Sequence, residues 1–180
     1  MKELLIQIVN YKLNVGEIIM KVLIIGSVAS GKSTLARRLS QKTNIKNYEI
    51  DLIVHDDVNK IKRNNEKQQE IIKNINKNND WIIEGTLRKN LYNLLDMADR
   101  IIYLDIPLKT RKKRIFIRYL KQKLKIENSS YKPNKELLEK MYKWTEEFET
   151  DREKYEERLL MYKEKLVILK NNKDIKNICR

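Results

Sequence analysis

The sequence predicts an α/β fold in which five parallel strands form one sheet with helices on both faces. Short apolar runs, bounded by turn-forming residues, alternate along the chain with segments in which apolar residues recur every three or four positions. The apolar runs are continuous, which is typical of strands that are buried on both faces of a parallel sheet. With 180 residues, the chain is long enough to bury a sizeable core in one such domain.

The elements follow from these patterns in chain order. Strands are expected over residues 21–25, 48–51, 81–84, 100–105 and 166–169. Helices are expected over 32–42, 66–78 and 88–98, and the last two place their isoleucines or leucines on one face. Pro107 suits the first position of a further helix that runs to about residue 125, because its missing N–H costs nothing there. Residues 126–134 are expected to form a loop, and 134–165 a second long helical stretch.

The last two helical segments carry opposite charges. Residues 109–125 contain nine Lys or Arg and no acid, whereas residues 134–160 contain nine acids and six bases. The first segment accounts for most of the net charge of +14, so the basic character is concentrated in one place. We therefore expect the segments to pair as a helical lid over about residues 109–165.

The segment from Gly26 to Ser33 has the spacing of a phosphate-binding loop, Gly-x-x-x-x-Gly-Lys-Ser, between a strand and a helix. In such a loop the backbone N–H groups surround nucleotide phosphates, the lysine contacts the β- and γ-phosphates, and the helix N-terminus adds positive charge. The Ser33 hydroxyl is expected to bind magnesium. The predicted nucleotide-binding residues are Gly26, Ser27, Ala29, Ser30, Gly31, Lys32, Ser33 and Thr34.

Other features limit the class of protein. Cys179 is the single cysteine, so no internal disulfide can form, and polar residues interrupt the apolar N-terminal segment. No apolar run is long enough to span a membrane, and we expect a cytoplasmic protein. Because Met20 directly precedes the first strand, residues 1–19 are interpreted as an N-terminal extension of a single domain over 20–180. Its deletion is expected to leave nucleotide binding and thermal stability nearly unchanged.

Three acidic residues stand at the predicted carboxyl ends of strands, where open parallel sheets bind their ligands. Asp51 is a candidate base for a hydroxyl acceptor or a residue that orients magnesium-bound water, and Glu84 is a candidate magnesium ligand through water. Asp105 is interpreted as the cap of the following helix.

Several arginines are candidates for binding phosphate. Gly85 would let a ligand approach the backbone, and Arg88 would bind a phosphate of the acceptor from the start of a helix. Arg111, Arg114 and Arg118 lie on one face of the basic helix, where they would stabilise the transferred phosphoryl group. Arg152, on the returning helix, is a further candidate from the opposite side of the lid.

The segments "GSVASGKSTLARRL", "WIIEGTLRKNLYNLLDMADRIIYLDIP" and "RKKRIFIRYLK" together resemble the bacterial topology-modulation protein family of P-loop kinases, which is similar to adenylate kinase. The resemblance covers about residue 21 to the C-terminus and implies a three-layer P-loop kinase fold with a short helical lid. "EGTLR" resembles the adenylate-kinase segment whose arginine holds the acceptor's phosphate, which places Arg88 in that role. "RIFIR" matches an Arg-x-x-x-Arg pair that leads into the lid, which implies catalytic roles for Arg114 and Arg118.

This chain also departs from its relatives. The Thr-Gly-Asp segment that adenylate kinases carry after the second strand is replaced by "YEIDLIVHDD", and the lid is shorter. An aromatic residue that the topology-modulation family often has after the second-strand Asp is missing. These differences leave the acceptor open.

The sequence supports two candidate functions. The first is a kinase that uses ATP and magnesium to phosphorylate a small molecule, a nucleoside or a nucleotide according to the resemblance, with Lys32, Asp51, Glu84, Arg114 and Arg118 as catalytic residues. A phosphate acceptor needs arginines and a hydroxyl acceptor is helped by a carboxylate base, and the chain offers both in Arg88 and Asp51. The alternative is a nucleotide-dependent, DNA-associated regulator with weak ATPase activity, which would bind duplex DNA in a strongly salt-dependent manner.

Overall fold

The computed structural model describes residues 20–56, 61–126, 134–171 and 173–175. The predicted N-terminal extension, Cys179 and most of the predicted 126–134 loop lie outside the described residues.

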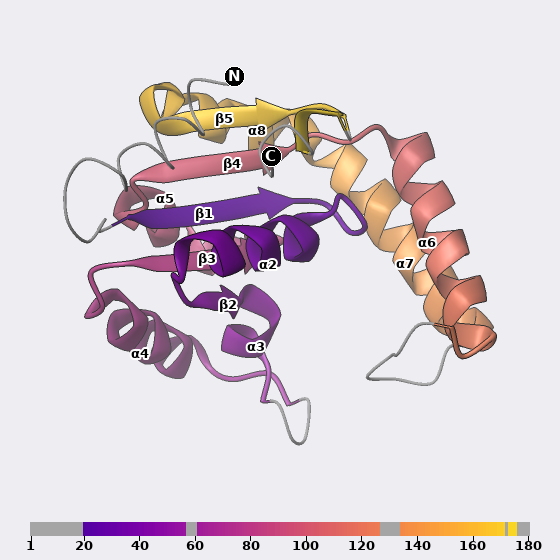
Figure 1. Ribbon diagram of the computed structural model, residues 1–180, viewed down its shortest axis with the longest axis horizontal. Coiled ribbons are helices and arrows are strands. Elements are labelled where there is room, and N and C mark those ends of the chain that lie inside the picture. Colours follow the sequence, from indigo (N-terminus) through magenta and orange to yellow (C-terminus); the bar gives the residue numbers. More distant parts are fainter. Residues whose placement is uncertain (1–19, 57–60, 127–133, 172, 176–180) are drawn as a thin grey trace.

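Five parallel strands form the sheet, in the order β2-β3-β1-β4-β5 (Figure 1). The strands are β1 Lys21–Gly26, β2 Asn47–Glu49, β3 Trp81–Gly85, β4 Arg100–Leu104 and β5 Leu166–Leu169. β1 lies in the centre, between β3 and β4, and its end leads directly into the phosphate-binding loop. The predicted five-stranded parallel sheet is therefore confirmed.

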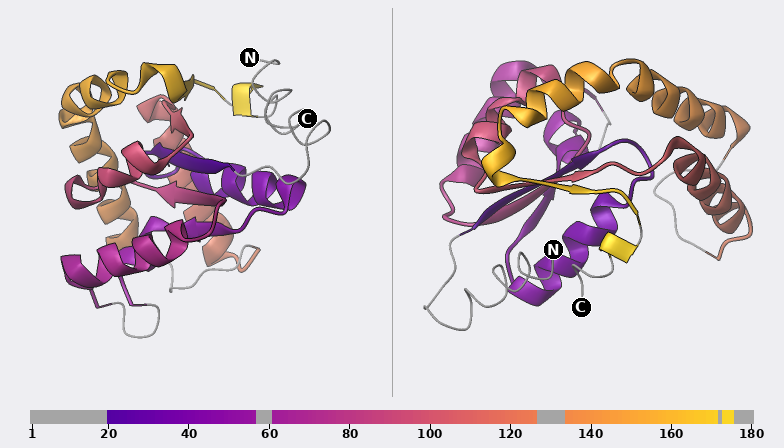
Figure 2. Two further views of the ribbon diagram at one scale, coloured as in Figure 1. Left: turned by 90° about the vertical axis from the view of Figure 1, so that its left-hand side faces the viewer. Right: turned by 90° about the horizontal axis from the view of Figure 1, so that it is seen from above.

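Helices cover both faces of this sheet (Figure 2). Alternate residues of β1 supply two hydrophobic cores, with Val22 and Ile24 on one face and Leu23 and Ile25 on the other. α2 Lys32–Thr43 covers the first face. The second face is covered by the helices α3 Ile50–Val54, α4 Asn65–Asn76, α5 Asn93–Met97 and α8 Arg152–Leu160.

Two longer helices, α6 Leu108–Lys123 and α7 Lys135–Thr150, lie side by side beyond the carboxyl ends of the strands (Figure 1). They correspond to the predicted basic and acidic segments, and Lys112 of α6 pairs with Glu146 of α7 at 2.6 Å. Among the described residues, no helix is both long and apolar enough to cross a bilayer.

The second strand is shorter than predicted. β2 ends at Glu49, and the residues after it form α3, so Asp51 lies in the first turn of a helix and not at the end of a strand. The buried residues of α3 are Ile50, Ile53 and Val54, a spacing that buries one face of a helix. A short segment that mixes Ile, Leu and Val with one acid fits a buried strand as well as one face of a short helix, which explains the error.

Three helical predictions also need correction. The stretch over 134–165 is divided at Asp151, which ends α7 and precedes α8, and the 3-10 helix η2 Lys163–Lys165 follows. The stretch over 88–98 comprises the 3-10 helix η1 Lys89–Leu91 and the short α5. Pro107 is the N-cap of α6 and not its first residue.

Candidate active site

The loop between β1 and α2 has a backbone conformation that depends on glycine. Gly31 has a φ of 107°, and Ala29, in the middle of the loop, also has a positive φ of 57°. A Cβ atom on Gly26 would lie 2.8 Å from the carbonyl oxygen of Leu104 in the neighbouring strand. Gly26 therefore has no room for a side chain, and the positive φ of Gly31 favours glycine there.

The polar groups of this loop are arranged for an anion. Among the residues that the structure describes, no side chain caps the N-terminus of α2, so its first backbone N–H groups face the loop. The Ser30 hydroxyl is fully buried and has no hydrogen-bond partner among the described residues. Ser33 and Thr34 are exposed in the first turn of the same helix. A buried hydroxyl beside free N–H groups fits a phosphate ligand, because buried polar groups are normally paired.

Lys32 points back over the loop. Its Nζ donates a hydrogen bond to the carbonyl oxygen of Ser27 at 2.9 Å. Burial lowers the pKa of Lys32, and the carboxylates of Glu84 and Asp51 oppose this shift through their charge. The predicted catalytic lysine thus lies within electrostatic reach of both predicted catalytic acids.

Ser33 and Glu84 are brought together, as their predicted magnesium role requires. The Ser33 hydroxyl lies near the Glu84 carboxylate, which is 4% exposed at the end of β3. Burial raises the pKa of Glu84, and the Ser33 hydroxyl and the charge of Lys32 act in the opposite direction. The described residues contain no cluster of three or more His, Cys, Asp or Glu that would hold a metal alone. One hydroxyl and one carboxylate suit Mg²⁺, which completes its shell with water and substrate phosphates.

Asp51 and Arg88 form an ion pair, with 3.0 Å between Asp51 Oδ1 and Arg88 Nη2. Asp51 comes from the first turn of α3, and Arg88 precedes η1 in an extended conformation. Gly85, predicted to admit a ligand, instead admits Ile50 of α3: a Cβ on Gly85 would lie 2.5 Å from the Ile50 Cβ.

Arg111 does not lie in an open phosphate site. Its guanidinium is 2% exposed, donates to the carbonyl oxygen of Ile106 at 2.8 Å and to Ser27 Oγ at 2.5 Å, and pairs with Glu149 of α7. This arginine therefore supports the phosphate-binding loop through its hydrogen bond to Ser27, whereas the sequence analysis predicted a contact with substrate.

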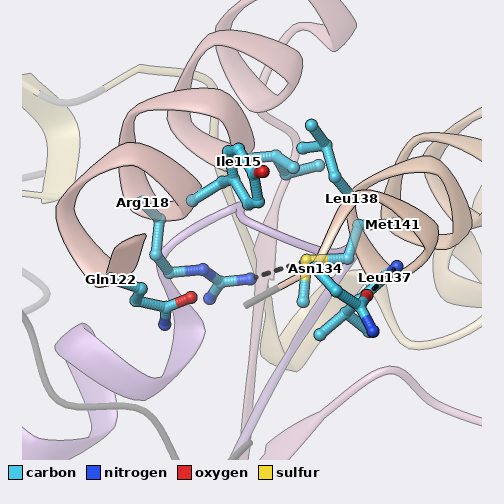
Figure 3. A pocket seen from close by; sticks show the side chains of 8 residues that line it. Ile115, Arg118, Gln122, Asn134, Leu137, Leu138 and Met141 are labelled. Atoms are coloured by element: carbon cyan, nitrogen blue, oxygen red, sulfur yellow. Dashed lines mark hydrogen bonds between the residues drawn. The ribbon is translucent and has the colours of Figure 1, made fainter. Parts of the chain in front are cut away.

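Arg114 of α6 contacts the phosphate-binding loop, whereas Arg118 of the same helix contacts α7. Arg114 Nη1 donates to the carbonyl oxygens of Ala29 and Ser30, at 2.9 and 2.6 Å. Arg118 lies in a pocket between α6 and α7, where its guanidinium points across to Met141 (Figure 3), with 3.3 Å between Nη2 and Sδ. Its charge also lowers the pKa of Lys32. Thioether sulfur is a weak acceptor, so among the described residues Arg118 keeps most of its hydrogen-bonding capacity for a ligand.

Arg152 is part of an internal network and not of an open binding surface. It donates to Asp105 at 2.7 Å and to Glu156 at 2.7 Å, and lies 3.5 Å from Glu149. Asp105 therefore pairs with Arg152, and no side chain in the described part of the chain caps α6, so the predicted capping role of Asp105 is wrong.

Sequence reasoning missed Glu149, the residue that connects this network. It pairs with Arg111 on one side and Arg152 on the other, and so joins Arg111, which contacts the phosphate-binding loop, to α7 and α8. The only signal in the sequence was the acidic character of α7 opposite a basic helix, which did not single out one glutamate.

A family model described as an AAA domain matches residues 22–136, more than half of the chain. No curated protein matches the sequence. The structure is similar to a shikimate kinase from Bacteroides thetaiotaomicron, with a TM-score of 0.51 and 11% identity over 89% of this chain and 94% of that one. It is also similar to a deoxyadenosine kinase from M. mycoides with bound dATP, with a TM-score of 0.51 and 18% identity over 89% and 95% of the two chains. The chain thus has the P-loop kinase fold that the resemblance implied.

Proposed function

The chain belongs to the AAA domain family. Because it also has a P-loop kinase fold, we propose that it is an ATP- and magnesium-dependent kinase whose small-molecule substrate is a nucleoside or a nucleotide. The observation that carries this proposal is the convergence of Lys32, Ser33 and Glu84 on a loop whose buried Ser30 hydroxyl has no partner among the described residues. A buried lysine, a buried carboxylate and a buried hydroxyl without a partner among the described residues do not help a turn to fold. Such a cluster is typical of a functional site.

The residues divide the work of phosphoryl transfer between them. The loop N–H groups would hold the nucleotide's phosphates, and Lys32 would move from Ser27 to contact the β- and γ-phosphates. Ser33 and Glu84 would hold magnesium, which when bound neutralises negative charge on the phosphates. Arg114 and Arg118 would stabilise the charge that develops on the transferred group.

The experiment is a comparison of two lysine variants of α2. Lys32→Ala should lower phosphoryl transfer from labelled ATP by about 10²-fold or more, since one preorganised charge is lost. Lys42→Ala removes a lysine from the exposed last turn of the same helix and should leave transfer unchanged. The acceptors are a panel of nucleosides, nucleotides and other hydroxylated metabolites, and thermal melts check that both variants fold. Undiminished ATP turnover by Lys32→Ala would overturn the kinase proposal.

A further inference from the structure

The ion pair between Asp51 and Arg88 narrows the class of acceptor. The Asp51 side chain is 73% exposed and that of Arg88 35%, and their contact joins α3 to the segment after β3. An exposed pair of this kind contributes little to stability, so folding alone gives no reason for it. The pair does change the electrostatics of the acceptor side, because the one arginine predicted to hold an acceptor phosphate is already neutralised by a carboxylate.

Further carboxylates surround the same place. Glu49 and Glu84 are direct partners in the register between β2 and β3, and Asp51 follows Glu49 by two residues. The charges of Glu49 and Asp51 both act on Glu84, and that of Asp51 also acts on Lys32. Negative charge therefore gathers around Asp51, the residue that contacts Arg88 and also acts on Lys32 and Glu84. A phosphate dianion would be repelled there, whereas a neutral hydroxyl would not.

We propose that the acceptor group is a hydroxyl, that Asp51 is its general base, and that Arg88 positions the Asp51 carboxylate. This inference rests on the proposed kinase function and excludes nucleoside monophosphates as acceptors. In the reaction, the hydroxyl oxygen forms a bond to the γ-phosphorus of ATP, and the bond from that phosphorus to the β–γ bridging oxygen breaks. ADP leaves with that electron pair, and the hydroxyl proton passes to an Asp51 oxygen.

The first test does not require the acceptor to be known. Protein saturated with magnesium and a non-hydrolysable ATP analogue is titrated with inorganic phosphate. Asp51→Asn should bind phosphate at least tenfold more tightly than the unmodified protein, because Arg88 loses its carboxylate partner. The gain should disappear in the double variant Asp51→Asn, Arg88→Gln. Glu70→Gln, which breaks the exposed Lys67–Glu70 pair on α4, is the matched control and should change nothing.

The outcomes of this titration are distinct. If Asp51→Asn gains no affinity for phosphate, or Glu70→Gln gains as much, the role of Asp51 in excluding a phosphate acceptor is overturned. The ATP analogue is added before phosphate. If it does not bind, the proposed kinase function is overturned, and this outcome is distinct from a failure of the Asp51 proposal.

The second test follows transfer of label from ATP to nucleosides and to their own 5′-monophosphates. For each pair, we expect the nucleoside to be labelled faster than its 5′-monophosphate. Faster labelling of the monophosphate would overturn the proposal. Asp51→Asn should lower kcat by about 10²-fold, the usual contribution of a general base, with little change in the KM for ATP. A positioning role for Arg88 predicts that Arg88→Lys retains more of the kcat than Arg88→Ala, and equal losses would assign Arg88 another role.

Discussion

Glu84 is the residue whose chemistry depends most directly on its burial. Its raised pKa means that it takes up a proton at a higher pH than an exposed glutamate, and the neutral acid attracts magnesium poorly. We predict that the magnesium concentration for half-maximal activity rises as the pH is lowered, and that this rise begins at a higher pH than for an exposed glutamate. Glu84→Gln should need more magnesium at every pH and lose this pH dependence. The measurement is a magnesium titration of initial rates, and the same pH profile in both proteins would exclude Glu84 as the cause.

The residues of the site differ in how far the sequence could identify them. Gly26 to Ser33 lie within one short motif, so their spacing alone predicted that they meet. Glu84 was predicted because it ends a buried strand, and its closeness to Ser33 follows from the adjacency of β1 and β3. The pairing of Arg88 with Asp51 was not predicted, since each was assigned separately and only the folded chain places the two side chains 3.0 Å apart.

At the scale of elements, the contact between β3 and α3 leaves no room for a side chain at Gly85. A Cβ atom would lie 2.5 Å from Ile50 Cβ, and the φ of 157° is also unfavourable for other residues. We predict that Gly85→Ala lowers the free energy of unfolding by about 1–3 kcal/mol, the usual cost of overpacking a buried contact. Urea denaturation measures this change. Since the clashing atom is a Cβ, Ile50→Ala should not rescue the variant, and rescue would show that the clash lies elsewhere.

The arginines of α6 separate into two kinds, although their shared helix face predicted one role for all three. Arg114→Ala and Arg118→Ala should each lower kcat by about 10²-fold or more, with a smaller effect on ATP affinity. Arg111→Met should instead lower the free energy of unfolding by about 2–4 kcal/mol, because it leaves Glu149 without its buried partner. Steady-state kinetics and urea denaturation of all three variants distinguish the two effects.

The same variants test the DNA-binding alternative. If the basic helix serves duplex DNA, Arg114→Ala and Arg118→Ala would keep full turnover and lose salt-sensitive DNA binding. The structure gives this alternative no specific support, because the described contacts of these arginines are with the phosphate-binding loop and α7. Membership of the topology-modulation family remains a prediction.

The periodicity of apolar residues predicted the existence of the helices and strands more accurately than the residues at which they end. β1, β3, β4 and β5 are continuous apolar runs, and their limits agree with the prediction to within one residue. The helical stretch over 134–165 was misread because no proline or glycine marks its division at Asp151. Asp151 ends α7 and Arg152 of α8 turns back to pair with Asp105 of the strand layer, a tertiary contact that local propensity cannot reveal.

For the whole molecule, the main consequence of the structure is that the phosphate-binding loop and the helices beyond it are joined by a chain of charges. Ser27 contacts Arg111, Arg111 and Arg152 share Glu149, and Arg152 pairs with Asp105 at the end of β4. Sequence patterns predicted a basic helix opposite an acidic one. They could not predict that one glutamate serves two arginines, since these partners are distant in sequence and meet only after folding.

This network predicts that nucleotide binding and the stability of the helical pair depend on one another. A ligand at 100 times its Kd stabilises a folded protein by about 2.7 kcal/mol, so ATP with magnesium should raise the Tm. In Glu149→Gln, Arg111 loses its carboxylate and holds Ser27 less firmly, so the affinity for ATP should fall and the rise in Tm at fixed ATP should be smaller. Glu146→Gln is the matched control, because it removes a glutamate of the same helix that pairs with Lys112 of α6 at the exposed surface. Isothermal titration and thermal melts with and without ATP measure both quantities. If both variants lose the same ATP affinity and the same rise in Tm, the general contact between α6 and α7 is responsible. The link from Glu149 through Arg111 to the loop is then excluded as the cause.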